Sequence, residues 1–169
     1  MLIGTGEGGS AAARPEGLVD SRLVFRKIPG HTRDEVLREL GTRIAAEGRI
    51  RDANELASKL LERERLGCTG LGAGIAIPHC KSRTIEEVVV AVATTEEPID
   101  FGAADGVAVD LIVVVVSPLE AAAAHLQALA RVSRLLRTPG IADALRKADS
   151  KDRMLDLLRE AEAGLPVAR

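Results

Sequence analysis

Apolar residues along the chain follow two different periods, which divide it into helices and strands. The first helical stretch has one apolar face, made of Val36, Leu37, Leu40, Ile44 and Ala45. Spacings of three and four residues predict an amphipathic helix here. Thr32 and Glu35 form a capping box at the start of this helix, and Gly48 ends it.

A second helix is expected shortly after the first. Asp52 stands in the position of its N-cap, and Gly67 stops it. Its apolar positions are Leu56, Leu60 and Leu61. Arg63 and Glu64 lie near its end. Two consecutive helices therefore precede the longest apolar runs of the chain.

Residues 88–93 and 109–116 form two runs in which nearly every position is apolar, without the helical spacing. Such runs are typical of strands that are buried on both faces. Residues 18–28 and 75–77 predict shorter strands. Between the two runs, the segment EEPIDFGAADG (residues 96–106) is interpreted as a turn, a short strand and a second turn.

The last third of the chain is predicted to be helical. One helix runs from about Leu119 to Leu136, Thr138 and Pro139 open another, and Ser150 opens a last one that ends near Gly164. This order of elements predicts an α/β fold, a single-domain sandwich in which a small mixed β-sheet is flanked by helices on both faces. Residues 1–17, rich in Gly, Ala and Ser, are predicted to be a disordered N-terminal extension of a domain at 18–169.

Composition excludes several classes of function. The net charge is -2, so no broad basic surface is expected, and we predict no nucleic-acid partner. The chain has no Trp, no Tyr and only two Phe, so platforms for stacking bases or sugars are nearly absent. It has no apolar run long enough for a membrane span, so we expect no membrane insertion, and we expect no signal peptide. Cys68 and Cys80 are expected to be reduced thiols in a cytoplasmic protein.

The segment GLGAGIAIPH (residues 70–79) carries the first candidate for chemistry, His79. Glycines admit a close approach of a backbone or a large anion, and Pro78 restricts the backbone just before the imidazole. A neutral imidazole nitrogen is a good nucleophile toward phosphorus. Arg63 offers a planar fork for a phosphoryl group. His125 lies on the apolar stripe of the predicted 119–136 helix.

Each of these side chains also has an ordinary structural interpretation. By residue type alone, His79 fits a surface or core histidine, Arg63 a solvated charge and His125 a satisfied core residue. A metal site from these histidines and the two cysteines matches no common zinc spacing, so no metal is expected. A G-x-S-x-G elbow is absent, and the glycines at 4, 6 and 9 lack the strand that a dinucleotide site requires.

The segment RERLGCTGLGAGIAIPH, from Arg63 to His79, resembles a known active-site motif. It is similar to that of the enzyme IIA proteins of the bacterial phosphotransferase system, in the fructose, mannitol and nitrogen-regulatory class (EIIA type 2). The matching positions are Arg63, Glu64, Thr69, Gly70, Gly72, Gly74, Ala76, Pro78 and His79. EEPIDFGAADGVAVDLIVVVVSP and HLQALARVSRLL resemble the central hairpin and strand of the family and the helix that bears its second histidine. The resemblance covers about residues 18–162.

The resemblance implies roles for individual residues. His79 would accept the phosphoryl group, Arg63 would neutralise it, and His125 would be the second active-site histidine. Thr69, Gly70, Gly72 and Gly74 would contact the phosphoryl group or a partner. Leu71, Ala73 and Ile75 would be available for docking. Cys68 and Cys80 depart from the usual residues of the family and would slow transfer, and no cofactor is implied.

The resemblance also implies partners. An HPr-like phosphocarrier protein would be the donor, and either regulatory target proteins or an enzyme IIB would follow. RERLG, TG and HLQALA are most like the nitrogen-regulatory branch, in which phosphorylation controls partner binding. A sugar-transport enzyme IIA that passes phosphate to an enzyme IIB is the first alternative. A binding module without phosphotransfer is the second.

Overall fold

The two apolar runs form the centre of the sheet, in the computed structural model that describes residues 17–164. β5 (Val89–Ile99) and β6 (Val109–Pro118) pair antiparallel. Successive side chains of β6 enter two different clusters of buried residues, one on each face of the sheet. Ile112 and Val114 lie in one cluster, and Leu111 and Val113 lie in the other. The prediction of strands buried on both faces is confirmed.

Four shorter strands complete a six-stranded mixed sheet. β1 (Val24–Ile28) runs parallel to β5. On the other side, β3 (Ile75–Ala76) and β4 (His79–Ser82) pair one after the other along β6, both parallel to it. β2 (Gly70–Gly72) pairs antiparallel with β3 at the edge. The strand order is β1-β5-β6-β3-β2, with β4 also against β6.

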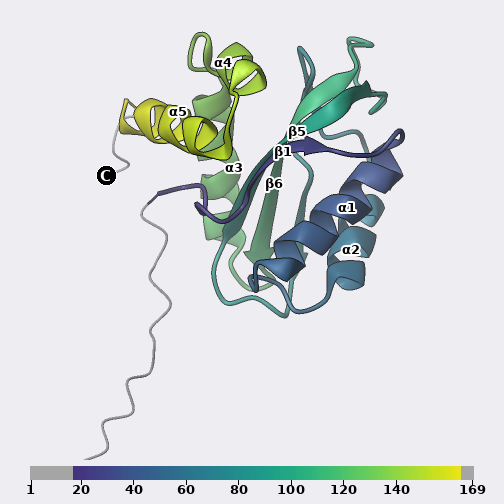
Figure 1. Ribbon diagram of the computed structural model, residues 1–169. Coiled ribbons are helices and arrows are strands. Elements are labelled where there is room, and N and C mark those ends of the chain that lie inside the picture. The colour runs from purple at the N-terminus through teal and green to yellow at the C-terminus, as the bar shows by residue number, and fades with distance from the viewer. Residues whose placement is uncertain (1–16, 165–169) are drawn as a thin grey trace, which may run out of the picture.

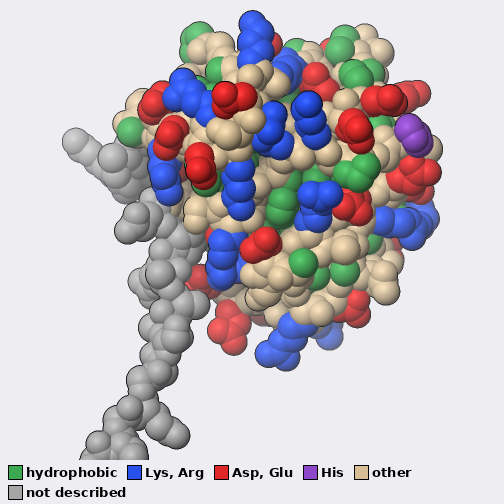
Figure 2. Space-filling view, in the orientation of Figure 1, with side chains coloured by type: hydrophobic (Ala, Val, Ile, Leu, Met, Phe, Trp, Pro, Cys, Tyr) green, Lys and Arg blue, Asp and Glu red, His purple; other side chains and the backbone are tan. Residues whose placement is uncertain are grey.

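Helices cover both faces of this sheet (Figure 1). α1 (Arg33–Ala46) and α2 (Ala53–Arg65) lie on one side. α3 (Ala122–Leu136), α4 (Ile141–Lys147) and α5 (Lys151–Ala163) lie on the other. The predicted α/β sandwich is therefore confirmed. Lys and Arg side chains alternate with Asp and Glu over the face seen in Figure 2, as the small net charge leads one to expect.

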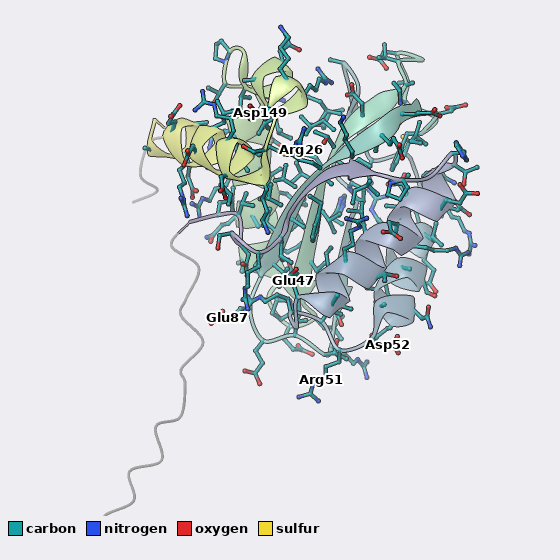
Figure 3. All side chains as sticks on the ribbon, in the orientation of Figure 1. Arg26, Glu47, Arg51, Asp52, Glu87 and Asp149 are labelled. Carbon is teal, nitrogen blue, oxygen red and sulfur yellow. The ribbon has the colours of Figure 1, made fainter. Side chains whose placement is uncertain are left out.

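Three of the predicted helix starts are confirmed by their caps, whereas α4 begins at Ile141 with Gly140 as its N-cap, and not at Thr138 and Pro139 as predicted. The Thr32 hydroxyl accepts a hydrogen bond from the Glu35 amide at 3.2 Å. The Asp52 carboxylate, at the start of α2 in Figure 3, accepts from the Asn54 amide at 2.9 Å. The Ser150 hydroxyl caps α5 in the same way. Each cap satisfies an amide that has no partner inside its helix.

Two further local predictions were wrong, and two short strands were missed. No turn interrupts the chain at residues 96–98, because β5 continues as far as Ile99, which pairs with Val109. Glu96 and Glu97 are exposed on this stretch, so their polarity imitated a turn. α3 begins at Ala122, because the Leu119 amide, directly after β6, still bonds to the carbonyl of Ser82 at the end of β4. β2 and β4 were not predicted, since short edge strands have no apolar period of their own.

The predicted extension at residues 1–17 lies almost wholly outside the described residues. At its boundary, the Leu18 amide donates to the Glu162 carboxylate of α5 at 2.6 Å. The domain boundary at residue 18 stays a prediction. Among the described helices, none combines the length and the apolar character that crossing a bilayer requires.

Candidate functional site

His79 is the first residue of β4, directly after the proline that separates β3 from β4. The Pro78 carbonyl accepts from the Val115 amide at 3.0 Å, which fixes this junction to the central strand. The imidazole Nδ1 of His79 lies 2.8 Å from the carbonyl oxygen of Ile77. A carbonyl oxygen can only accept, so Nδ1 carries the proton and Nε2 carries the lone pair.

Arg63 reaches this lone pair from the last turn of α2. Its Nε–H donates to His79 Nε2 at 3.3 Å, and one terminal N–H donates to the Gly67 carbonyl at 2.9 Å. The guanidinium therefore stands beside the free imidazole nitrogen. A cation at this position favours any anion that approaches Nε2.

His125 comes from the first turn of α3. Its ring centroid lies 5.6 Å from that of His79, and its Nδ1 shares a 2.7 Å hydrogen bond with the hydroxyl of Ser117. Ser117 is fully buried and His125 is 8% exposed. Burial lowers the pKa of His125, and electrostatic interactions with His79 and Lys81 lower it further. The structure thus brings Arg63, His79 and His125 together from three elements.

The glycine-rich stretch packs closely against the rest of the protein. A Cβ at Gly70 would lie 2.9 Å from the Ala103 side chain, and one at Gly74 would lie 2.7 Å from an Arg146 nitrogen. Gly72 and Gly74 have left-handed φ angles of +90° and +78°. The glycines are required by these contacts and angles. Their contact with a phosphoryl group or a partner stays a prediction.

Thr69 is buried, and its polar groups are already bonded inside the protein. The Thr69 hydroxyl contacts one carboxylate oxygen of Glu64, and the Thr69 amide donates to the other at 3.2 Å. Glu64 is 3% exposed. Sequence reasoning assigned no role to Glu64 or to Ser117. For Glu64 the only signal was its match to the motif, and for Ser117 there was none.

The two cysteines lie in different environments. Cys80 is buried, and burial raises the pKa of its thiol to about 12. Cys68 is exposed, and its Sγ lies 3.2 Å from the Phe101 carbonyl oxygen. Over residues 17–164, no cluster of three or more His, Cys, Asp or Glu side chains is arranged to bind a metal ion.

Exposed apolar side chains lie next to the site residues in the sequence. Leu66, one turn after Arg63, is 86% exposed, and Leu126, next to His125, is 67% exposed. Leu71 and Ala73 are exposed as expected. Ile75 is only 7% exposed, so the prediction that it is available for docking was wrong. Ile75 lies in β3 and pairs with Leu111 of β6, so it is part of the sheet.

Comparison with known proteins points to one family. The family described as "Phosphoenolpyruvate-dependent sugar phosphotransferase system, EIIA 2" matches residues 17–161. A nitrogen regulatory protein of Pseudomonas aeruginosa is 34% identical over 81% of this chain and 89% of its own length. One from Bradyrhizobium diazoefficiens is 39% identical over 76% and 84%. A fructose-specific EIIA component of Haloferax volcanii is 33% identical over 82% and 90%.

Solved structures agree with the sequence relatives. The nitrogen regulatory protein IIA-Ntr of Neisseria meningitidis superposes with a TM-score of 0.76 at 26% identity, over 83% of this chain and 96% of that one. Enzyme IIA of the Escherichia coli mannitol system, solved in complex with phosphorylated enzyme IIB, shares the fold with a TM-score of 0.69 at 22% identity, over 82% and 95%. The chain therefore belongs to the EIIA type 2 family of the phosphotransferase system.

Proposed function

We propose that this protein is a phosphohistidine relay protein, which accepts a phosphoryl group on His79 from an HPr-like phosphocarrier protein. The observation that carries the proposal is the arrangement of three side chains. His79 presents an unprotonated Nε2, the Arg63 guanidinium stands 3.3 Å from it, and the His125 ring lies beside both. A nucleophile, a cation and a second imidazole at one point suit an incoming phosphoryl group.

The transfer step balances without a cofactor. The lone pair of His79 Nε2 forms a bond to phosphorus while the bond between phosphorus and the donor imidazole breaks. The proton stays on His79 Nδ1 throughout, donated in a hydrogen bond to the Ile77 carbonyl oxygen. Arg63 turns from the nitrogen to the equatorial oxygens, and His125 hydrogen-bonds to the phosphoryl group or to His79. Such a transfer depends mainly on positioning and on charge stabilisation.

Partners would dock on the exposed leucines around the site. Leu66, Leu71 and Leu126 offer apolar surface on segments that also carry the site residues. The arriving phosphoryl group adds about -1.5 to -2 charges at the same place. A target protein that docks through apolar or acidic groups then binds the unphosphorylated form more tightly, by roughly 1–3 kcal/mol of coupling.

We favour a nitrogen-regulatory role, in which phosphorylation acts as an off-switch for partner binding. It is supported by the two nitrogen regulatory relatives and by the Neisseria structure. A sugar-transport enzyme IIA is the alternative, favoured by the fructose-specific relative and by the fold shared with the mannitol enzyme in its complex with enzyme IIB. A binding module without phosphotransfer ranks third, because Arg63, His79 and His125 are all present.

The test is incubation with phosphoenolpyruvate, enzyme I and a phosphocarrier protein. Label should appear in an acid-labile, base-stable form and be absent in His79→Ala. The loaded protein is then offered to fructose- and mannitol-type enzyme IIB, and cytosolic partners are captured in both states. Full labelling of His79→Ala would refute the proposal that His79 accepts the phosphoryl group. Rapid discharge by an enzyme IIB, with equal partner capture in both states, selects the transport alternative.

A further inference from the structure

Glu64 is a buried carboxylate that the transfer step does not use. It is 3% exposed, and both of its oxygens are bonded to Thr69, one to the hydroxyl and one to the amide. Among the described residues, no ion pair joins Glu64 to a cation. Removing a carboxylate from water without a cationic partner is costly. The bonds to Thr69 are what offset that cost.

The pair closes the loop between α2 and β2. Glu64 lies in the last turn of the helix and Thr69 lies just before the strand, so the two bonds tie the ends of residues 65–68 together. Gly67 lies within this loop, and its carbonyl accepts the hydrogen bond from Arg63. The loop geometry therefore sets where one arm of the guanidinium is held.

A second path leads from the same pair to His79. The Thr69 carbonyl accepts from the Ile77 amide at 3.0 Å. The Ile77 carbonyl, in turn, lies 2.8 Å from His79 Nδ1 and keeps the proton on that nitrogen. Glu64 and Thr69 thus anchor Ile77, whose carbonyl selects the His79 tautomer. They also anchor the loop with the Gly67 carbonyl, which orients Arg63.

We propose that Glu64 and Thr69 are positioning residues, which hold His79 in the tautomer with a free Nε2 and hold Arg63 against it. This rests on the proposed role of His79 as phosphoryl acceptor. The Thr69 hydroxyl, being bonded to Glu64, acts through the loop and not on the phosphoryl group. Neither residue touches the reacting atoms, and both act through the Gly67 and Ile77 carbonyls.

The main test is Thr69→Val, which keeps the shape and the backbone amide and replaces only the hydroxyl by a methyl group. Nitrogen-15 NMR of the imidazoles reports which nitrogen of His79 carries the proton. In the wild type, Nδ1 should carry it. In Thr69→Val, a measurable fraction should carry it on Nε2, and the initial rate of phosphorylation should fall about 10- to 100-fold, as small misplacements of reacting groups do.

Thr69→Ser retains the hydroxyl and should restore both the tautomer and the rate. Glu64→Gln keeps one acceptor oxygen and replaces the other by an NH2 donor, so it should show an intermediate tautomer shift. The matched control is Thr95→Val, because Thr95 is 8% exposed, close to the 7% of Thr69, and its hydroxyl has no partner among the described residues. This control should keep the wild-type tautomer and rate.

Wild-type His79 signals in Thr69→Val would overturn the proposal, and so would equal slowing of Thr69→Val and Thr95→Val, which indicates a general loss of core order. The tautomer comparison needs no phosphate. If His79→Ala still takes up label, the proposed function fails, while the NMR comparison still decides whether Glu64 and Thr69 position the imidazole.

Discussion

Ser117→Ala isolates the hydrogen bond that orients the second histidine. The Ser117 hydroxyl lies 2.7 Å from His125 Nδ1, and the two residues are 0% and 8% exposed. Alanine leaves that ring nitrogen buried without its partner. An unsatisfied buried polar group costs about 1–3 kcal/mol. In a chain of this length, each kcal/mol lowers the melting temperature by about 2–4 °C.

The assay is urea unfolding at pH 8 in a double-mutant cycle with His125→Ala. Removing the hydroxyl should cost about 1–3 kcal/mol when His125 is present and much less when it is absent, because the unpaired nitrogen is then gone too. The phosphorylation rate should fall as well, since the ring beside His79 loses its fixed orientation. Equal losses with and without His125 would refute the reasoning and assign the cost to packing alone.

Three further changes test other parts of the site. Arg63→Ala should keep the fold and slow phosphotransfer by roughly tenfold to a thousandfold, which is equivalent to ~1.4–4 kcal/mol. Arg63→Lys should restore the rate only in part, because lysine lacks the planar fork. A wild-type rate in Arg63→Ala would show that Arg63 is not part of the site. Gly74→Ala should destabilise the protein by about 1–2 kcal/mol, because alanine is strained at the left-handed φ of +78° at this position. Thermal unfolding measures this, and an unchanged melting temperature contradicts it. The pKa of His125 is lowered in the folded state, so its contribution to stability is present above its ordinary value of 6.5 and is lost as pH falls below it, because the unfolded chain then binds a proton that the folded chain resists. Between pH 7.5 and 5.5, the free energy of unfolding measured in urea should therefore fall less in His125→Gln than in the wild type. Identical decreases would contradict the view that the folded protein holds the His125 ring buried and neutral.

Local sequence was enough to predict most of the elements. The capping residues Thr32, Asp52 and Ser150 act on amides two or three residues away, so their signals are readable without the fold. The runs that became β5 and β6 are apolar at nearly every position, and only a strand covered on both faces buries them fully. The motif from Arg63 to His79 predicted the family and two of the three residues that the structure brings together.

Tertiary structure decided what depends on neighbours far along the chain. Arg63, His79 and His125 meet because the end of α2, the start of β4 and the first turn of α3 converge, and no local period encodes that meeting. Ile75 and Ala73 are two residues apart in the same glycine-rich segment, yet only Ile75 is buried, because β3 pairs with β6. Side-chain type and spacing fix local conformation, whereas pairing and packing determine which surfaces remain in water and which polar groups find a partner.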